Sequence, residues 1–142
     1  MDRNKFENLV REAAVDYVSS NEINLVERAR RGISKKTLDK IAQLSGISLR
    51  ELSSLLPVSL RTIQRYSDDD LLDPAVSERA LIITEVLARG LDVFQTSEKL
   101  LHWLHTPAVS LGNRTPLSLL DTSFGARLVT DVLGRIEHGV HS

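Results

Sequence analysis

Residues 48–66 read SLRELSSLLPVSLRTIQRY, and they hold the most informative pattern in the chain. The pattern predicts two short helices, 48–56 and 59–66, separated by Pro57, and each of them opens on a serine. A serine hydroxyl in that place can accept hydrogen bonds from the free amides of the first helical turn, and Ser48 with Glu51 has the spacing of a capping box. Two capped helices joined by a short turn within about twenty residues have the dimensions of a helix-turn-helix.

The second of these helices predicts how the motif would bind DNA. Four leucine, valine and isoleucine side chains would pack inside the motif, at Leu52, Leu55, Val58 and Ile63. The outward side chains are of the types that read a major groove: arginine bonds guanine, glutamine bonds adenine, and a threonine methyl contacts thymine. Polar groups at the helix N-termini suit phosphate oxygens. The predicted DNA contacts are Ser48, Arg50, Ser59, Arg61, Thr62, Gln64 and Arg65.

The charge pattern supports the same prediction. The net charge of the chain is −1, yet residues 28–66 carry nine basic groups against two acidic ones. A basic block in a near-neutral chain is typical of a segment that binds a polyanion. On charge alone, a solvated basic face remains the alternative.

The motif resembles the DNA-binding unit of the Xre/Cro class of bacterial regulators. The turn of that class usually reads leucine-glycine-valine-serine, whereas this chain has Leu56, Pro57, Val58 and Ser59. Proline cannot supply the positive φ that glycine gives. The turn geometry and the angle of the second helix are therefore left open.

Periodic apolar residues predict helices along the rest of the chain. Near the N-terminus Phe6, Leu9, Val10, Ala13, Ala14 and Tyr17 form one stripe, and Ile23, Val26 and Ala29 form a shorter one closed by Gly32. A helix is also predicted over 34–45, and no stretch alternates cleanly enough for a strand. The fold class is therefore all-α.

The second half is predicted to form four more helices. Asp73 and Pro74 open a long helix with a stripe of Val76, Ala80, Ile83, Leu87, Leu91 and Phe94. Thr96 caps another helix, which carries Leu100, Leu104 and a core Trp103. A turn at Gly112 and Asn113 leads to a short helix at Pro116, and a terminal helix places Phe124, Leu128, Val132 and Ile136 on one face. The acidic run 68–73 is the best linker candidate, with a simple helix lead-in as the alternative.

Composition limits the possible functions. The chain has 142 residues, of which 42% are hydrophobic, enough for one domain or two small ones. It has no cysteine, no apolar run of about 20 residues and no apolar leader segment, so we expect a cytoplasmic protein without disulfides. The pairs His102/His105 and His138/His141 have no third ligand, and Asp68–Asp70 is typical of a solvated run. No metal site, cofactor, catalytic residue or enzyme activity is predicted.

The C-terminal half carries a dense resemblance to a known family. The segments SER, VLARGLDVF, WLHTP, LGNRTPLSLL, GARLV and LGRIEHGV follow one another between Ser77 and Ser142. This order resembles the C-terminal domain of the Xre antitoxins of the MbcA/ParS/Xre family, whose partners are RES-domain toxins. The resemblance implies a helix-turn-helix DNA-binding domain at 1–68 and a small helical toxin-binding domain at 69–142.

The resemblance also implies a function and a set of contacts. Toxins of this kind have an ADP-ribosyltransferase-like fold and consume NAD, and the antitoxin blocks the toxin's active site and represses its own operon. The terminal helix stays patterned almost to the chain end, and Gly139 would cap it and free the last residues to enter a pocket. A frayed end is the alternative. The predicted toxin contacts are Arg114, Arg135, Glu137, His138, Val140, His141 and Ser142.

Two readings of the function remain open. The first is an antitoxin that represses its own operon, with a toxin and operator DNA as partners. The second is a stand-alone regulator whose C-terminal half serves dimerisation or ligand sensing. In both cases a homodimer is expected, through the N-terminal stripe or the long helix around Ile83 and Leu87, because such regulators read two half-sites.

Overall fold

The computed structural model describes residues 22–139, and within that range it is all-helical, as predicted. The N-terminal stripe from Phe6 to Tyr17 and the tail residues Val140, His141 and Ser142 lie outside the described residues. Apart from two isolated bridges, residues 22–139 form no strand. The helices are α2 Glu22–Arg31, α3 Lys35–Ser45, α4 Leu49–Ser54, α5 Leu60–Arg65, α6 Pro74–Phe94, α7 Ser97–Leu104 and α8 Ser123–Glu137, with the 3-10 helices η1 Val109–Leu111 and η2 Leu117–Asp121.

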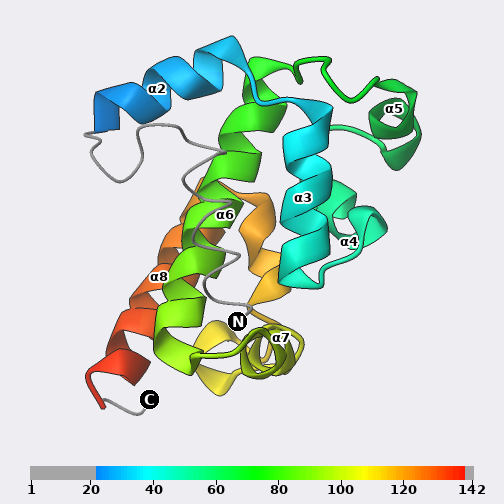
Figure 1. Ribbon diagram of the computed structural model, residues 1–142. Coiled ribbons are helices and arrows are strands. Elements are labelled where there is room, and N and C mark those ends of the chain that lie inside the picture. Colours follow the sequence, from blue (N-terminus) through cyan, green and yellow to red (C-terminus); the bar gives the residue numbers. More distant parts are fainter. Residues whose placement is uncertain (1–21, 140–142) are drawn as a thin grey trace.

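Helix α6 is the axis of the fold. In Figure 1, α8 runs along α6, α2 crosses its upper end, and α3 stands beside it with α4 and α5 further out. Helix α7 and the end of α8 lie near the lower end of α6, whereas α5 lies near the upper end. Helix α5 and the last turn of α8 are thus at opposite ends of the described structure.

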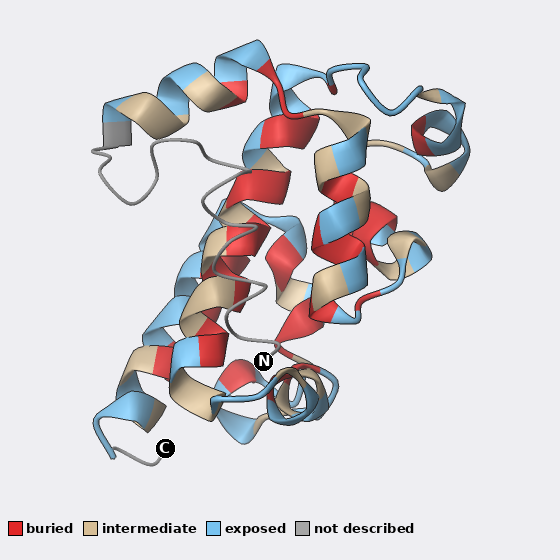
Figure 2. Cartoon of the chain, in the orientation of Figure 1, coloured by how far each residue is buried: buried red, intermediate tan, exposed pale blue. Residues whose placement is uncertain are grey.

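Helix α6 is buried on more sides than its sequence pattern suggests. The predicted stripe lies inside, except that Phe94 is half-buried, and several further positions are buried as well. Because α2, α3, α7 and α8 all pack on it, α6 has red segments along most of its length in Figure 2. The buried residues are Val76, Ser77, Ala80, Leu81, Ile83, Thr84, Val86, Leu87, Gly90 and Leu91.

The predicted serine and threonine caps form at four helix N-termini. The hydroxyls of Ser34, Ser48 and Ser59 accept hydrogen bonds from the third helical amide of α3, α4 and α5, and Thr96 does the same for α7. Each cap satisfies an amide that has no partner within its helix. Asp73 is an exception, since its side chain makes no cap bond and Pro74 alone marks the start of α6.

The acidic run 68–73, which connects α5 to α6, is a strap whose backbone is hydrogen-bonded to residues at the start of α3. The amides of Lys35 and Lys36 donate to the carbonyls of Asp70 and Asp68, each at 2.9 Å. The amide of Leu72 then donates to the carbonyl of Ile33 at 2.8 Å. These bonds satisfy free amides at the start of α3 and hold the chain between α5 and α6 against it.

The strap meets α6 at a buried serine. The hydroxyl of Ser77, which is fully buried, accepts from the amide of Ile33 at 3.0 Å and donates to the carbonyl of Leu72 at 3.2 Å. Gly32 precedes this junction with φ +94°, and a Cβ there would come within 2.5 Å of the Leu72 carbonyl oxygen. Only glycine suits both that backbone conformation and that close approach.

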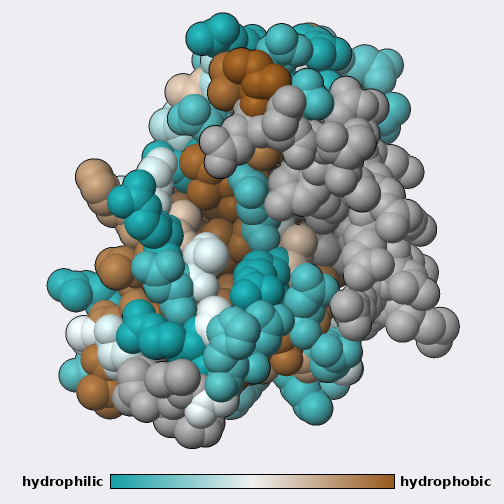
Figure 3. Space-filling view, turned by 90° about the vertical axis from the view of Figure 1, so that its left-hand side faces the viewer, coloured by the Kyte–Doolittle hydropathy of each residue, from teal (hydrophilic) through white to brown (hydrophobic). Residues whose placement is uncertain are grey.

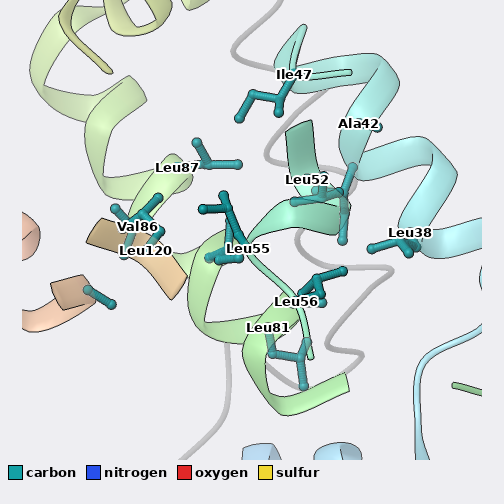
Figure 4. Packing of buried hydrophobic residues seen from close by; sticks show 14 of the residues in the cluster. Leu38, Ala42, Ile47, Leu52, Leu55, Leu56, Leu81, Val86, Leu87 and Leu120 are labelled. Carbon is teal, nitrogen blue, oxygen red and sulfur yellow. The ribbon is translucent and has the colours of Figure 1, made fainter. Parts of the chain in front are cut away.

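One hydrophobic core crosses the predicted domain boundary at residue 68. Figure 4 shows Leu52 and Leu55 of the helix-turn-helix close to Leu87 of α6 and Leu120 of η2. All four are among the buried residues of a single cluster. The helix-turn-helix is therefore packed on the rest of the chain rather than joined to it only by a flexible linker.

We expect Ser77→Ala to lower the free energy of unfolding by about 1 to 3 kcal/mol, because it leaves a buried amide and a buried carbonyl without this partner. The matched control is Ser118→Ala, whose exposed hydroxyl donates to the carbonyl of Thr115, and we expect it to change stability by less than about 0.5 kcal/mol. Urea unfolding of both variants measures the difference. Equal effects of the two substitutions would contradict the role given to Ser77.

Candidate functional site

The helix-turn-helix is formed by α4 and α5, and its interior is close to the prediction. Leu52, Leu55 and Ile63 are buried and Val58 is half-buried. Leu56, which was not assigned to the interior, is also buried, at 7% exposed. These side chains fix the angle between α4 and α5.

Proline 57 forms the turn without a left-handed residue. The amide of Val58 donates to the carbonyl of Leu56 at 2.8 Å, which closes a γ-turn centred on Pro57. A γ-turn of the inverse type needs a central φ near −75°, which the proline ring readily provides. No residue from Leu55 to Ser59 has positive φ. The chain thus replaces the usual glycine turn with a different geometry.

The seven predicted DNA contacts are all exposed: Ser48, Arg50, Ser59, Arg61, Thr62, Gln64 and Arg65. Their hydroxyls are not equally available, because the Ser59 hydroxyl accepts from the Thr62 amide at 3.1 Å and donates to the Thr62 hydroxyl at 2.9 Å. The Thr62 hydroxyl keeps its own proton to donate. Thr62 is therefore better placed than Ser59 to donate a hydroxyl hydrogen bond to DNA.

Part of the basic block is neutralised within the chain. Lys35 pairs with Asp39 at 2.7 Å, and Lys36 lies 3.6 Å from Asp69 of the strap. Burial, and next the charge of Arg31, lower the pKa of Arg28. The exposed cationic side chains of the basic block include Arg30 and Arg31 in α2, Arg50 in α4, and Arg61 and Arg65 in α5. The exposed positive charge is thus carried mainly by arginines, whose guanidinium groups can form bidentate hydrogen bonds with phosphates and guanines.

At the other end of the structure, the last turn of α8 is fixed to α6 by a salt bridge. The guanidinium of Arg89 donates two hydrogen bonds to Glu137, at 2.6 and 3.1 Å, across 48 residues of sequence. Arg89 also lines an open hollow of about 580 Å³ with Thr130, Asp131, Gly134, Arg135 and His138 of α8. Two of the predicted toxin contacts, Arg135 and His138, therefore lie together at this hollow.

The other predicted toxin contacts are placed differently. Glu137 is engaged by Arg89, a partner that sequence reasoning missed because nothing in the pattern marks a pair so far apart. Arg114 is exposed on the turn between η1 and η2, away from α8 in the sequence. Gly139 has the predicted left-handed conformation, with φ +76°.

The apolar face predicted for α8 does not form. Phe124 and Leu128 are 76% and 51% exposed, whereas Val132 is buried and Ile136 is half-buried. Each step of four residues turns about 40° around a helix, so the four positions from Phe124 to Ile136 span about 120°. The row therefore begins on the exposed side of α8 and reaches the buried side at Val132. The core-facing side consists of Gly125, Ala126, Val129, Val132 and Leu133.

Helix α7 contacts the helix-turn-helix region of the chain. A Cβ on Gly46, at the end of α3, would lie 2.7 Å from Leu101 of α7, so these helices are in close contact. The Glu51 carboxylate lies 2.8 Å from the Nε2 of His105. Only half of the expected capping box is therefore present: Ser48 caps the Glu51 amide, while the Glu51 side chain pairs with His105.

The other side of α7 has an open hollow. Phe94 and Trp103 lie with their ring centroids 5.4 Å apart at its wall, and Trp103 is half-buried rather than a core residue as expected. Among residues 22–139, no three histidine or acidic side chains are grouped so that they could hold a metal ion. No helix in the same range is long and apolar enough to cross a membrane.

Comparisons with known proteins agree with this arrangement. A family model for the antitoxin Xre-like helix-turn-helix domain matches residues 25–81. A model for the antitoxin Xre/MbcA/ParS C-terminal toxin-binding domain matches residues 89–139. The chain is 34% identical over 120 residues to a protein named Antitoxin Xre from Yersinia enterocolitica, a match that covers 83% of this chain and 81% of that protein.

A second protein named Antitoxin Xre, from Photorhabdus laumondii, is 29% identical over 130 residues, which are 90% of this chain and 88% of that protein. The chain belongs to the Xre/MbcA/ParS antitoxin family. It has the family's helix-turn-helix and its C-terminal toxin-binding domain, and it is not an enzyme.

The pair of His105 and Glu51 makes stability depend on pH. Hydrogen bonds to the Leu101 carbonyl and, next, to Glu51 raise the pKa of His105. A pKa raised on folding stabilises the fold below the unfolded value, about 6.5 for histidine, and this stabilisation is lost as the pH rises through the folded value. Both side chains are more than 40% exposed, so solvent screening limits the effect to a fraction of about 1 kcal/mol.

We therefore expect His105→Gln to lower the free energy of unfolding by a few tenths of a kcal/mol at pH 6, and by less at pH 8. Denaturant unfolding at both pH values measures this difference. His102→Gln, on the exposed side of α7, serves as the control for the loss of an imidazole from the same helix. A larger effect of His105→Gln at pH 8 than at pH 6 would disprove the prediction.

Proposed function

We propose that the chain neutralises a RES-domain toxin that consumes NAD, and that it represses its own operon as a cytoplasmic homodimer. The observation that carries the proposal is the placement of two exposed surfaces at opposite ends of α6. The reading helix α5 is at one end and the last turn of α8 is at the other. One chain could therefore hold DNA and a toxin at the same time.

On the DNA side, we propose that α5 enters the major groove. Arg61, Gln64 and Arg65 would contact bases, and Ser48 and Arg50 would contact phosphates. Ser59 and Thr62, at the N-terminal end of this helix, would also contact the DNA. The exposure of these side chains and the rigid packing beneath α5 support this arrangement.

The proposed dimer does not use the part of the long helix around Ile83 and Leu87. Ile83 and Leu87 were candidates for it, but both are fully buried within one chain, so that choice was wrong. A narrow apolar hollow of about 160 Å³ lies between α2 and α6, lined by Leu25, Val26, Ala29, Glu78, Leu81, Ile82 and Glu85. The side of the molecule that Figure 3 shows has hydrophobic surface gathered in its upper middle part. Together with the N-terminal stripe, this surface is the proposed dimer contact.

On the toxin side, we propose that the end of α8 and the tail enter the toxin's NAD pocket. Arg135 and His138 would lie at the entrance, and residues 140–142 would occlude the substrate. Arg114 would contact the toxin from the turn between η1 and η2. Inhibition is then steric and needs no reaction by the antitoxin.

The alternative of a stand-alone regulator lacks a supporting observation. It would give the C-terminal half a role in dimerisation or ligand sensing, whereas residues 89–139 match a toxin-binding domain. A reading frame for a RES-domain protein beside the gene would favour the antitoxin directly. Co-purification of the two proteins would then establish the partner.

We expect Arg61→Ala or Arg65→Ala to weaken binding to the DNA upstream of the chain's own gene by about 1 to 3 kcal/mol, if the arginine concerned bonds a guanine. Gel shifts with that DNA measure the loss, on protein whose dimeric state is checked by light scattering. Arg114→Ala replaces an exposed arginine of the other half and is the matched control. Unchanged binding by both α5 variants would exclude this helix as the reader.

We expect truncation after Gly139 to abolish inhibition of the toxin. Residues 140–142 would be the part of the antitoxin that blocks the toxin's substrate pocket. All described contacts, including Arg89 with Glu137, remain in this variant. Truncation after Gly134 also removes Arg135. If Arg135 forms a buried contact with an acidic group of the toxin, its loss would weaken toxin binding by about 2 to 5 kcal/mol. Growth and cellular NAD on co-expression with the toxin measure protection.

Both truncated chains should keep operator binding, because α5 lies at the other end of the structure. Thermal unfolding confirms that they fold. Full protection by the folded chain truncated after Gly134 would show that the tail is not the inhibitory element. The block would then have to come from residues 111–120.

A further inference from the structure

Helix α8 exposes a line of side chains that the fold does not use. Phe124 is 76% exposed and Leu128 is 51% exposed, and because they are four residues apart they lie next to each other on α8 as an exposed apolar pair. Asp131 and Arg135 are exposed further along the helix. With 3.6 residues per turn, these four positions lie within about 60° of one another on the side opposite the core. We call Phe124, Leu128, Asp131 and Arg135 the α8 stripe.

The start of the stripe is arranged for contact with a partner. The guanidinium of Arg127 lies 5.7 Å from the centre of the Phe124 ring, over its face. A cation held over an aromatic ring restrains both side chains, so less conformational entropy is lost on binding. Aromatic and arginine side chains are also the types enriched among binding hot spots.

The stripe runs directly into the proposed tail interface. Asp131 and Arg135 also line the hollow beside Arg89, and α8 ends two residues after Arg135. The bidentate bond between Arg89 and Glu137 holds this last turn of α8 against α6. A partner that received the tail would meet the stripe as well.

Two other surfaces of the toxin-binding domain are covered within the chain. The core-facing side of α8 packs on α6 and η2. One side of α7 is in contact with the helix-turn-helix through Leu101 and His105. The stripe, in contrast, combines exposed apolar groups with continuity to the tail.

We propose that the α8 stripe docks on the toxin surface beside the pocket that the tail enters. Phe124 and Leu128 fill an apolar depression on that surface, and Arg127 and Arg135 face acidic groups at its rim. This inference rests on the proposed function, since the occupant is the same toxin. It gives the toxin interface an anchoring part, distinct from the tail that blocks the substrate.

Alanine substitution of the stripe measures its contribution to binding. We expect Phe124→Ala and Leu128→Ala each to raise the Kd for the proposed RES-domain toxin on the order of 10- to 100-fold. Both side chains are exposed, so the fold should be retained. The control is Leu71→Ala, because Leu71 is 53% exposed, matches Leu128 in type and exposure, and lies outside residues 89–139. Leu71→Ala should leave the Kd unchanged.

The possible outcomes distinguish failure of the stripe proposal from failure of the proposed function. If the unaltered chain binds the RES-domain protein and the two stripe variants bind it equally well, the stripe proposal is wrong and the function stands. If the unaltered chain does not bind that protein, both are wrong. If the variants keep the Kd but lose self-association in light scattering, the stripe contacts a second copy, which also overturns the proposal.

Discussion

The arrangement of this antitoxin depends on one buried hydroxyl. Ser77 joins the amide of Ile33, before α3, to the carbonyl of Leu72, at the end of the strap that follows α5. Both ends of the helix-turn-helix segment are thereby tied to the first turn of α6. Buried polar groups are stable only when paired, so this junction admits one register and excludes others. Gly32 allows the close approach that the junction requires.

From this junction, α6 acts as a rigid rod that belongs to both parts of the chain. The match to the helix-turn-helix domain ends at residue 81 and the match to the toxin-binding domain begins at residue 89, both within α6. A helix of 21 residues spans about 30 Å. The proposed DNA and toxin sites therefore lie at separate ends, and the contact of α7 with α3 and the pair of His105 with Glu51 join the two parts of the chain.

Local signals in the sequence predicted most helices and their caps, because a serine at an N-cap acts within one turn. Long-range pairing was not predictable in this way: Arg89 with Glu137 and Glu51 with His105 join residues 48 and 54 positions apart. The apolar period of α8 showed that the helix is amphipathic, but not that Phe124 would stay outside. That depends on how α8 packs against α6, which no single segment encodes.

The central claim is that DNA and toxin bind at opposite ends of one rigid chain. Hydrogen–deuterium exchange of the full chain, alone, with operator DNA and with the proposed RES-domain toxin, tests it most directly. We expect DNA to protect residues 59–66 and toxin to protect residues 123–139, with both regions protected when both partners are present. Protection of 59–66 by the toxin, or loss of DNA protection when toxin is added, would contradict the claim.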